Sequence, residues 1–318
     1  MQEMTHKYTR ETSIYYKEHC DKCTNCDTPF VNGSRSHLGY LSDGNCAVLC
    51  DACAYLLKET IIRYHWMKKE YESPLPDEKL WRYMDLSKFI SLISSRSLFF
   101  ASADSFEDPF EGAKGITPRK RKWDEYYLEF FREVIKTVPG IDSSTLTEGS
   151  VEKDAQRLLR EISESGQLAR QYTYISCWHQ NEQESEAMWR LYSRDVTNAV
   201  AIQTTAQKLY LALDRDPTID IGKVKYIDYG KQYATVNGAF WYKRKSFEHE
   251  REVRAILQSR DNPCAGHAIS VDIDILIDSI YISPYAPKWF AEVVKNVVER
   301  YEIKKPVYQS SMLVTPFF

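Results

Sequence analysis

The sequence predicts an α+β protein, in which a small N-terminal zinc-finger module precedes a mixed, mainly antiparallel sheet domain with a helical insertion. Three observations support this prediction. Six cysteines gather within residues 20–53, strand-like apolar runs recur from Leu80 onward, and two long amphipathic segments interrupt those runs at about 119–170. The Pro-rich stretch Glu72–Asp77 sets the boundary, so we expect modules at residues 1–72 and 78–318.

The composition is that of a folded protein. The chain has 318 residues, of which 43% are hydrophobic and 13% aromatic, enough for a sizeable core. A formal net charge of -3 gives no global attraction to nucleic acid or to an anionic membrane. The N-terminal segment lacks the apolar stretch of a signal peptide, and no run of eighteen apolar residues occurs. We therefore expect a cytoplasmic protein without a membrane partner.

The clustered cysteines have metal-ligand spacing. Cys23 with Cys26 and Cys50 with Cys53 form two Cys-x-x-Cys pairs separated by a polar loop, which predicts a structural zinc site. In a chain without a signal peptide, such clustering favours metal binding over disulfides.

Cys20 and Cys46, with His19 and His37 nearby, leave two alternatives open: a shift of register in the ligand set, or a second partial site. A helix is predicted after the second pair, at Ala54–Ile62 and on toward Tyr71. Its basic residues are few and more typical of a solvated face than of DNA recognition: Lys58, Arg63, Lys68 and Lys69. The order of knuckle and helix resembles a treble-clef finger, and VLCDACAYLLKE resembles the GATA-type finger. This resemblance implies the fold of the module more than any DNA binding.

The second module opens with a strand–helix–strand unit. A run beginning at Leu80 and the apolar run Leu98–Ala101 flank a short amphipathic helix. An acidic turn follows, in which the Asp-Pro dipeptide restricts the backbone. We therefore expect Asp108 and Glu111 to be held in place as part of a site.

The helical insertion is predicted as helices at Trp123–Val138 and Val151–Arg170. The basic run Arg119–Lys122 before them is either a solvated helix start or a contact to phosphate. Further strands are predicted at Gln171–Trp178, Asn198–Gln203, Gly222–Tyr229, Ala268–Ile273, Ser279–Ile282 and Val307–Leu313, with helices at Glu184–Tyr192 and Pro287–Tyr301. Trp189 and Tyr192 in the first of these helices are either core or a platform for a ligand ring.

Charges concentrate on a late strand predicted at Glu250–Leu257. A period of two places Glu250, Glu252 and Arg254 on one face, and adjacent carboxylates raise each other's pKa unless a cation such as Arg254 or a neighbouring lysine intervenes. This predicts a polar cleft, and an exposed edge strand with surface ion pairs is the alternative. Cys177 and His179 also leave open a Cys–His nucleophile pair.

These segments together resemble the bacterial family called domain of unknown function 2971. The resemblance covers residues 80 to about 313 and rests on LWRY, FFASADSFEDPFE, SCW with MWRLY, and Lys243 with the Phe247, Glu250, Glu252 and Arg254 that follow it. Glu107 stands where the family tends to have Asn. The family implies almost no mechanism.

A more distant resemblance is to ADP-ribosyltransferases of the DarT and toxin type. It rests on Arg82 and Tyr83 on the first strand, Ser102 at the end of the second, and Glu250-x-Glu252 on the late strand. The resemblance implies an enzyme that consumes NAD, such as a bacterial toxin or phage-defence effector, with a protein or nucleic acid as acceptor.

The same resemblance implies roles for individual residues. Arg82 would hold the phosphates or ribose of NAD, and Tyr83 or Tyr192 would stack on the nicotinamide. Glu252 would bind a ribose hydroxyl and stabilise the oxocarbenium-like charge, while Glu250 would orient or deprotonate the acceptor. Arg254 completes the expected catalytic set. The expected substrate- or cofactor-binding residues are Ser102, Asp108, Glu111, Trp189, Tyr192 and Lys243.

Two other functions remain open. One is a metal-dependent nuclease or phosphoesterase with Lys243 or Lys245 as its phosphate contact and an acidic ligand set of Asp108, Glu111, Glu250 and Glu252. The other is a non-enzymatic regulator that binds nucleic acid or protein through its zinc finger. The ADP-ribosyltransferase hypothesis requires Arg82 and the Glu250–Glu252 pair to share one cleft.

Overall fold

The structure is a computed structural model, and it describes residues 9–12, 22–30, 36–40, 46–56, 70–137, 146–193, 195–216, 218–259 and 262–318. The chain forms two compact units, Met1–Glu70 (unit 1) and Tyr71–Phe318 (unit 2). Beyond residue 56, the helix expected from Ala54 lies outside the described residues, and so do its four basic side chains.

Unit 1 is a small antiparallel sheet followed by a helical turn. Strand β2 (Ser36–Tyr40) pairs with both β1 (Thr9–Thr12) and β3 (Cys46–Leu49), and residues 51–56 are helical. Between β1 and β2, the backbone folds back on itself at residues 23–28, where the amide of Cys23 donates to the carbonyl of Thr28 at 2.8 Å. The apolar centre consists of Cys23, Leu49, Cys53 and Ala54.

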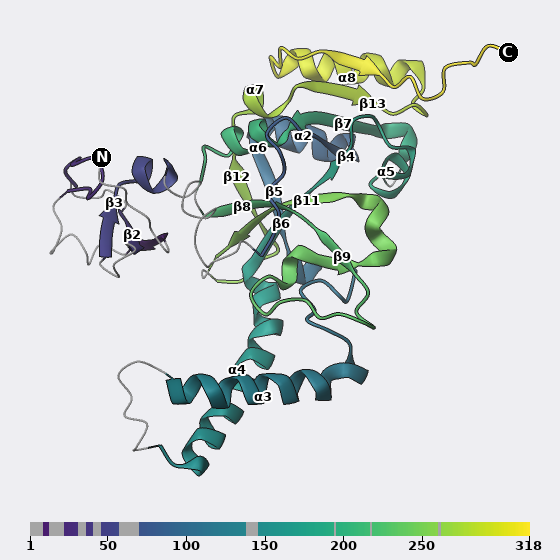
Figure 1. The fold of residues 1–318 in the computed structure, drawn as a ribbon. Helices are drawn as coiled ribbons and strands as arrows, with labels where there is room; N and C mark the ends of the chain where they lie inside the picture. The colour runs from purple at the N-terminus through teal and green to yellow at the C-terminus, as the bar shows by residue number, and fades with distance from the viewer. Residues whose placement is uncertain are drawn as a thin grey trace. The chain divides into compact units, whose positions relative to one another are not determined.

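Unit 2 is built on a nine-stranded sheet with the path β12-β5-β6-β4-β7-β13-β14, and β11 joins β6 to β8 (Figure 1). All its pairings are antiparallel except that of β13 with β14, which confirms the predicted mixed, mainly antiparallel sheet. The strands are β4 (Lys79–Asp85), β5 (Ser97–Ser102), β6 (Thr173–Gln180), β7 (Ala199–Thr205), β8 (Ile219–Lys223), β11 (Glu252–Gln258), β12 (Gly266–Ser270), β13 (Ser279–Ile282) and β14 (Val307–Gln309). A separate parallel pair is formed by β9 (Lys225–Ile227) and β10 (Tyr242–Arg244).

Helices cover one face of this sheet and irregular segments cover much of the other. Apolar side chains of α2 (Leu86–Ser95), α6 (Ala206–Ala212), α7 (Ile273–Leu276) and α8 (Lys288–Arg300) pack with alternate strand residues such as Leu80 and Trp178. On the opposite face, α5 (Glu186–Leu191) packs on Trp81 and Tyr83, and a second cluster includes Trp241 and Ile256. Short 3-10 turns complete the unit: η2 (Ala103–Ser105), η3 (Thr117–Arg119), η5 (Val196–Asn198), η6 (Ala239–Trp241) and η7 (Lys245–Glu250).

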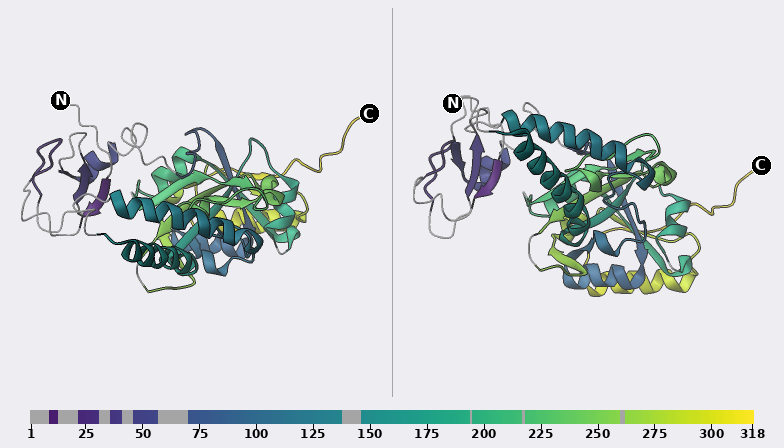
Figure 2. Two further views of the ribbon diagram at one scale, coloured as in Figure 1. Left: turned by 60° about the horizontal axis from the view of Figure 1, so that its bottom comes forward. Right: turned by 90° about the horizontal axis from the view of Figure 1, so that it is seen from below.

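The segment between β5 and β6 forms a helical hairpin. Helices α3 (Lys120–Thr137) and α4 (Glu148–Tyr172) pack on each other through Ile135, Val151 and Ala155, and the hairpin projects from the sheet (Figures 1 and 2). The basic run Arg119–Lys122 spans the end of η3 and the start of α3.

Several predicted strand limits are wrong. The late strand begins at Glu252 rather than Glu250, because Glu250 ends η7 and Arg251 adopts a left-handed conformation (φ 41°). The run Gly222–Tyr229 is divided between β8 and β9, which belong to different sheets. The last strand ends at Gln309, and the predicted strand Ala268–Ile273 ends at Ser270.

Strand β6 is the point at which the sheet divides. Residues 173–179 of β6 pair with β11 on one side, so that β11 is an interior strand and not the exposed edge considered from sequence. On its other side, β6 pairs with β5 only at Tyr174 and Ile175, and with β4 only at His179 and Gln180. Strands β4 and β5 therefore diverge along β6. We call this divergence the fork. Helix α2 connects the two strands in the sequence.

Candidate functional site

A cavity of about 530 Å³ lies at this fork. Its walls come from the diverging strands β4 and β5, from the segment of β6 between their pairing sites, and from α2. The volume falls in the range of roughly 300–1,000 Å³ that is usual for small-molecule sites. Predicted site residues that line the cavity are Arg82, Tyr83, Tyr192, Glu250 and Glu252.

Arg82 bridges the two arms of the fork. From β4, its Nη1 donates to Ser176 Oγ on β6 and its Nη2 lies 3.4 Å from the Phe99 carbonyl on β5. The guanidinium also lies over the Trp178 ring, 5.6 Å from its centroid. Among the described residues, no carboxylate forms an ion pair with Arg82, and burial lowers the pKa of this guanidinium. The Arg82 guanidinium is therefore positioned to bind an anionic ligand in the cavity.

A buried ionic network borders the same cavity through Glu250 and Glu252. The Lys243 ammonium forms ion pairs with Glu250 and with Glu252, the latter at 3.3 Å. Arg254 donates to Glu252 at 2.9 and 3.2 Å and to both oxygens of Glu111 at 2.5 and 2.9 Å. Lys243 thus lies between Glu250 and Glu252, and Arg254 between Glu252 and Glu111, as the cost of burying like charges requires.

This network keeps Glu252 ionised. Burial opposes ionisation, but the charges of Arg254 and Lys243 outweigh it and lower the pKa of Glu252 to about 2. The network contains three carboxylates and two cations, so its formal charge is -1 when all are ionised. Two of these carboxylates, Glu250 and Glu252, border the cavity.

Arg82 and Glu252 extend from opposite faces of the sheet. Trp81 pairs with His179, which in turn pairs with Glu252, so these three side chains share one face, while the next residue, Arg82, lies on the other. Both nevertheless line the same cavity, because the sheet is interrupted where β4 leaves β6. The fork therefore brings together charges that a continuous sheet would keep apart.

The aromatic residues expected around a ligand divide into two groups. Tyr192 borders the cavity and is 39% exposed, and burial and the nearby Glu252 and Glu250 carboxylates raise its pKa. Tyr83 also lines the cavity, where its hydroxyl accepts from the Ser185 amide at 2.8 Å. Trp189 is fully buried against Tyr83, with ring centroids 4.9 Å apart, and does not line the cavity. The structure therefore places Trp189 in the core, the alternative considered from the sequence, and not at the cavity.

Three other expected binding residues lie away from the cavity. Ser102 is buried, where it accepts from the Asp104 amide at the start of η2. Asp108 forms an ion pair with Arg244 at 2.8 Å. Both carboxylate oxygens of Glu111 accept hydrogen bonds from Arg254, and Glu111 does not line this cavity.

Arg254 and Lys243, two more of the predicted site residues, contact the glutamates and not the cavity. Arg254 is completely buried, and neither residue is part of the cavity wall. The five N–H groups of Arg254 all donate, the fifth bond being to the Phe240 carbonyl at 2.6 Å. These cations therefore position the glutamates rather than contact a ligand.

The acidic ligand set of a metal-dependent nuclease does not assemble. Its four carboxylates are paired with Arg244, Arg254 and Lys243. Across the part of the chain that the structure describes, only the four cysteines of unit 1 are grouped closely enough to hold a metal ion.

His179 borders the cavity, and the sequence had pointed to it only as the partner of Cys177 in a possible nucleophile pair. Its Nδ1 lies 2.5 Å from the Glu250 carbonyl, which can only accept, so Nδ1 carries the proton. Burial lowers the pKa of His179, and its buried Nε2 has no hydrogen-bond partner. The only sequence signal was its position two residues after Cys177 on a strand. Burial and the Glu252 carboxylate raise the pKa of Cys177, which argues against an activated Cys–His pair.

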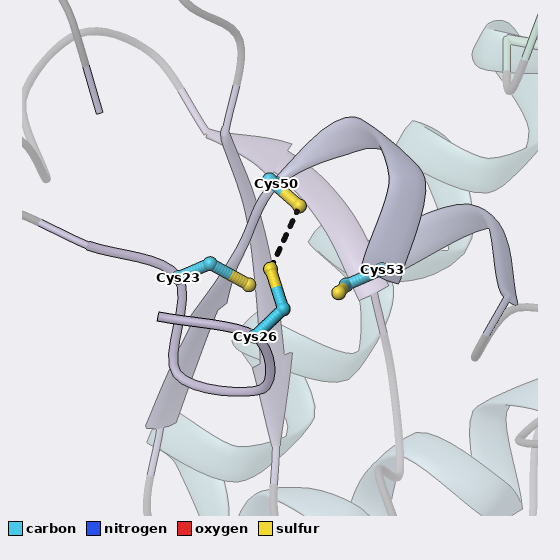
Figure 3. A group of neighbouring side chains, drawn as sticks. All are labelled: Cys23, Cys26, Cys50 and Cys53. Atoms are coloured by element: carbon cyan, nitrogen blue, oxygen red, sulfur yellow. Dashed lines mark hydrogen bonds between the residues drawn. The ribbon is translucent and has the colours of Figure 1, made fainter. Parts of the chain in front are cut away.

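In unit 1, the sulfur atoms of Cys23, Cys26, Cys50 and Cys53 converge (Figure 3). All four lie within 4.8 Å of one another, and the Cys26 and Cys50 sulfurs are 3.6 Å apart. The Asn25 amide donates to Cys53 Sγ at 3.3 Å. This grouping can hold one metal ion.

The other possible metal ligands named from the sequence lie either outside the described residues or outside the cysteine group. The side chain of Cys46 and all of Cys20 and His19 lie outside the described residues. His37 lies 2.7 Å from Asp51 and does not belong to the cysteine group.

No family model matches the chain, so the resemblance to domain of unknown function 2971 is not confirmed, and no curated protein matches it. Solved structures of DarT from Thermus sp. 2.9 show partial similarity. The complex with NAD+ has 6% identity and a TM-score of 0.35, over 75% of this chain and 97% of that chain. The complex with ADP-ribosylated single-stranded DNA has 9% identity and a TM-score of 0.33, over 75% and 95%. A similarity of this extent identifies no functional residue of this chain.

Within the described ranges, no helix has the length and apolar character needed to cross a membrane.

Proposed function

We propose that unit 2 cleaves NAD+ at the bond between nicotinamide and ribose and transfers the ADP-ribosyl group to an acceptor. The observation that carries this proposal is the division of charge within one cavity. An arginine with no carboxylate partner among the described residues lies on one arm of the fork, and two carboxylates of a network with excess negative charge border the same cavity. NAD+ carries a matching division, with an anionic pyrophosphate and a cationic nicotinamide ring.

In this proposal, Arg82 binds the pyrophosphate. Its fork of N–H donors suits phosphate oxygens better than a lysine would, and its contacts to Ser176 and Phe99 fix its direction. Tyr83 and Tyr192 supply aromatic walls against which the nicotinamide ring can pack.

Glu252 stabilises the positive charge that develops on the ribose. When the C1′–N bond breaks, nicotinamide leaves as a neutral molecule with the bonding electron pair, and C1′ becomes part of an oxocarbenium-like cation. A carboxylate with a pKa of about 2 remains negative throughout, and Arg254 and Lys243 hold it in place without reorganisation.

The acceptor then forms a bond to C1′ and loses a proton. Glu250 is the proposed group for orienting the acceptor or receiving this proton, because it borders the cavity beside Glu252. The acceptor itself is a nucleophilic group of a protein or nucleic acid, and water in its place would give free ADP-ribose.

We further propose that the four cysteines of unit 1 bind a structural zinc ion. A tetrahedral site with Zn–S distances of about 2.3 Å requires sulfurs about 3.8 Å apart, and the observed grouping agrees with this requirement. All four positions are occupied by protein thiols, so zinc would have a structural role and take no part in the reaction.

The decisive experiment measures nicotinamide released from NAD+ by the full-length protein. Wild type should release it, and Glu252→Gln should reduce the rate by about 100-fold or more, because an ionised group is lost from the transition state. Calorimetric titration should show that Glu252→Gln still binds NAD+. Glu248→Gln is the matched control, since Glu248 is exposed on η7, close to the network in sequence.

Full activity in a folded Glu252→Gln protein would contradict the proposal. Absence of both NAD+ binding and nicotinamide release in wild type would contradict it as well. Arg82→Gln should lower the affinity for NAD+ without changing the melting temperature by more than a few degrees.

A further inference from the structure

A second cavity, of about 350 Å³, lies where the α3–α4 hairpin meets the loop that follows the acidic turn. It shares no lining residue with the cavity at the fork. Its volume is again within the range of roughly 300–1,000 Å³ that is typical of small-molecule sites. Its polar lining residues include Lys114, Lys120, Ser163 and Arg170.

Lys114 is the central cation of this cavity. Its ammonium donates to the Ile162 carbonyl of α4 and lies 5.8 Å from the centroid of the Trp123 ring. No carboxylate of the described residues forms an ion pair with it, and burial lowers its pKa. A partly buried ammonium without a counter-ion gains stability when an anion binds beside it.

Arg170 supplies a second cation with unused hydrogen-bonding capacity. Its Nε is buried and has no hydrogen-bond partner, and the nearest carboxylate oxygen, on Asp104, is 3.4 Å away. The Asp104 side chain is 56% exposed, which makes this a weak pair. Lys120 is bound to Asp124 at 2.7 Å, and the one acidic residue of the lining, Glu111, accepts hydrogen bonds from Arg254 through both oxygens.

Gly166 leaves space for this arrangement. It lies inside helix α4, where glycine costs about 1 kcal/mol relative to alanine. A Cβ at this position would lie 3.3 Å from Lys114 Nζ, which is closer than most side-chain contacts. The glycine therefore allows the ammonium to approach the helix and keeps this wall of the cavity open. At Gly149, in the same helix, a Cβ would meet no atom within 4 Å.

We propose that this second cavity binds a phosphate group, with Lys114 and Arg170 as its cationic contacts. Two cations match a phosphate, which has several acceptor oxygens and more than one negative charge. The phosphate could belong to a free nucleotide or to a nucleic-acid backbone, because both present the same group. This proposal is independent of NAD+ cleavage at the fork.

The test uses full-length protein and calorimetric titration with sodium pyrophosphate, at constant ionic strength set with sodium chloride. Lys114→Gln should weaken binding at least tenfold. Lys153→Gln, which removes one exposed charge from α4, should leave binding unchanged. Gly166→Ala should also weaken binding, because its Cβ would press on Lys114 Nζ. Gly149→Ala, which raises helix propensity equally, should leave binding unchanged.

Equal affinity of wild type and Lys114→Gln for pyrophosphate, or no binding by wild type, would overturn the proposal. Two further titrations identify the source of the phosphate. Lys114-dependent binding of AMP alone indicates a free nucleotide, and Lys114-dependent binding of an abasic oligonucleotide indicates a nucleic-acid backbone. Nicotinamide release is measured in parallel, so that failure at the second cavity is distinguished from failure at the fork.

Discussion

Arg254 shows most directly how a residue's role depends on what surrounds it. Its spacing from Glu250 and Glu252 indicated a charged group at a catalytic strand, and the structure places it beneath the site with all its donors occupied. Its partner Glu111 is 143 positions away in the sequence. Spacing along one strand could identify the charged residues, but it could not show which of them face a ligand.

The ionisation of Glu252 should make stability depend on pH. Its pKa is about 2 in the folded protein and about 4.3 in an unfolded chain. Because the folded-state pKa is depressed, its contribution is complete above pH 4.3 and is lost as the pH falls toward 2. Glu252→Gln should therefore cost about 3–5 kcal/mol at pH 7, and the difference from wild type should shrink between pH 4.5 and 2.5.

Denaturant titrations of both proteins across this range measure that difference. Glu248→Gln should differ from wild type by less than about 0.5 kcal/mol throughout. If the difference in unfolding free energy between Glu252→Gln and wild type stays constant with pH, the depressed pKa of Glu252 is contradicted.

His179 should act as a hydrogen-bond acceptor for NAD+. His179→Asn keeps a donor near Nδ1 for the Glu250 carbonyl and removes Nε2, while His179→Gln can place an amide oxygen near Nε2. We expect His179→Asn to weaken NAD+ binding about tenfold, corresponding to one lost hydrogen bond, and His179→Gln to weaken it less. Calorimetry on both variants checks this order, and the reverse order would exclude the role of Nε2.

At the scale of elements, alternation and amphipathicity located most strands and helices of unit 2. The predicted insertion helix at Val151–Arg170, for example, lies within α4. The errors fall where the backbone changes direction, as at Arg251, or where one alternating run serves two sheets. A local pattern records which side chains are buried, but it does not record which strand is the neighbour.

The packing of strand β8 gives a prediction at the scale of secondary-structure elements. A Cβ at Gly222 would overlap the Tyr71 ring and lie 2.9 Å from the Trp241 ring. Gly222→Ala should therefore destabilise unit 2 by about 1–3 kcal/mol through overpacking. Gly149→Ala, at an exposed position of α4, should be neutral or stabilising by up to about 1 kcal/mol. Thermal unfolding measures both, and equal effects would show that β8 can shift to make room.

For the whole molecule, the two units should respond separately to loss of metal. Six of the seven tryptophans lie in residues 71–318, so tryptophan fluorescence mainly reports unit 2. Cys53→Ser should reduce bound zinc from one per chain to nearly none, while the fluorescence unfolding midpoint stays within a few degrees. Cys264→Ser, at an exposed cysteine of unit 2, is the control.

Metal analysis and fluorescence together check this prediction. Full zinc content in Cys53→Ser would exclude Cys53 as a ligand. Unchanged nicotinamide release in that variant would show that zinc has no role in the proposed reaction.

The sequence by itself determined the grouping of four cysteines and the α+β class, because each depends on spacing between residues that are close along the chain. Only the tertiary structure decided that β4 and β5 separate along β6 and that Arg82 and Glu252 border one cavity from opposite faces. It also decided that Trp189 is core and that Arg254 binds Glu111. These features depend on pairing between segments tens of residues apart or more, and no local period of two or 3.6 encodes such pairing.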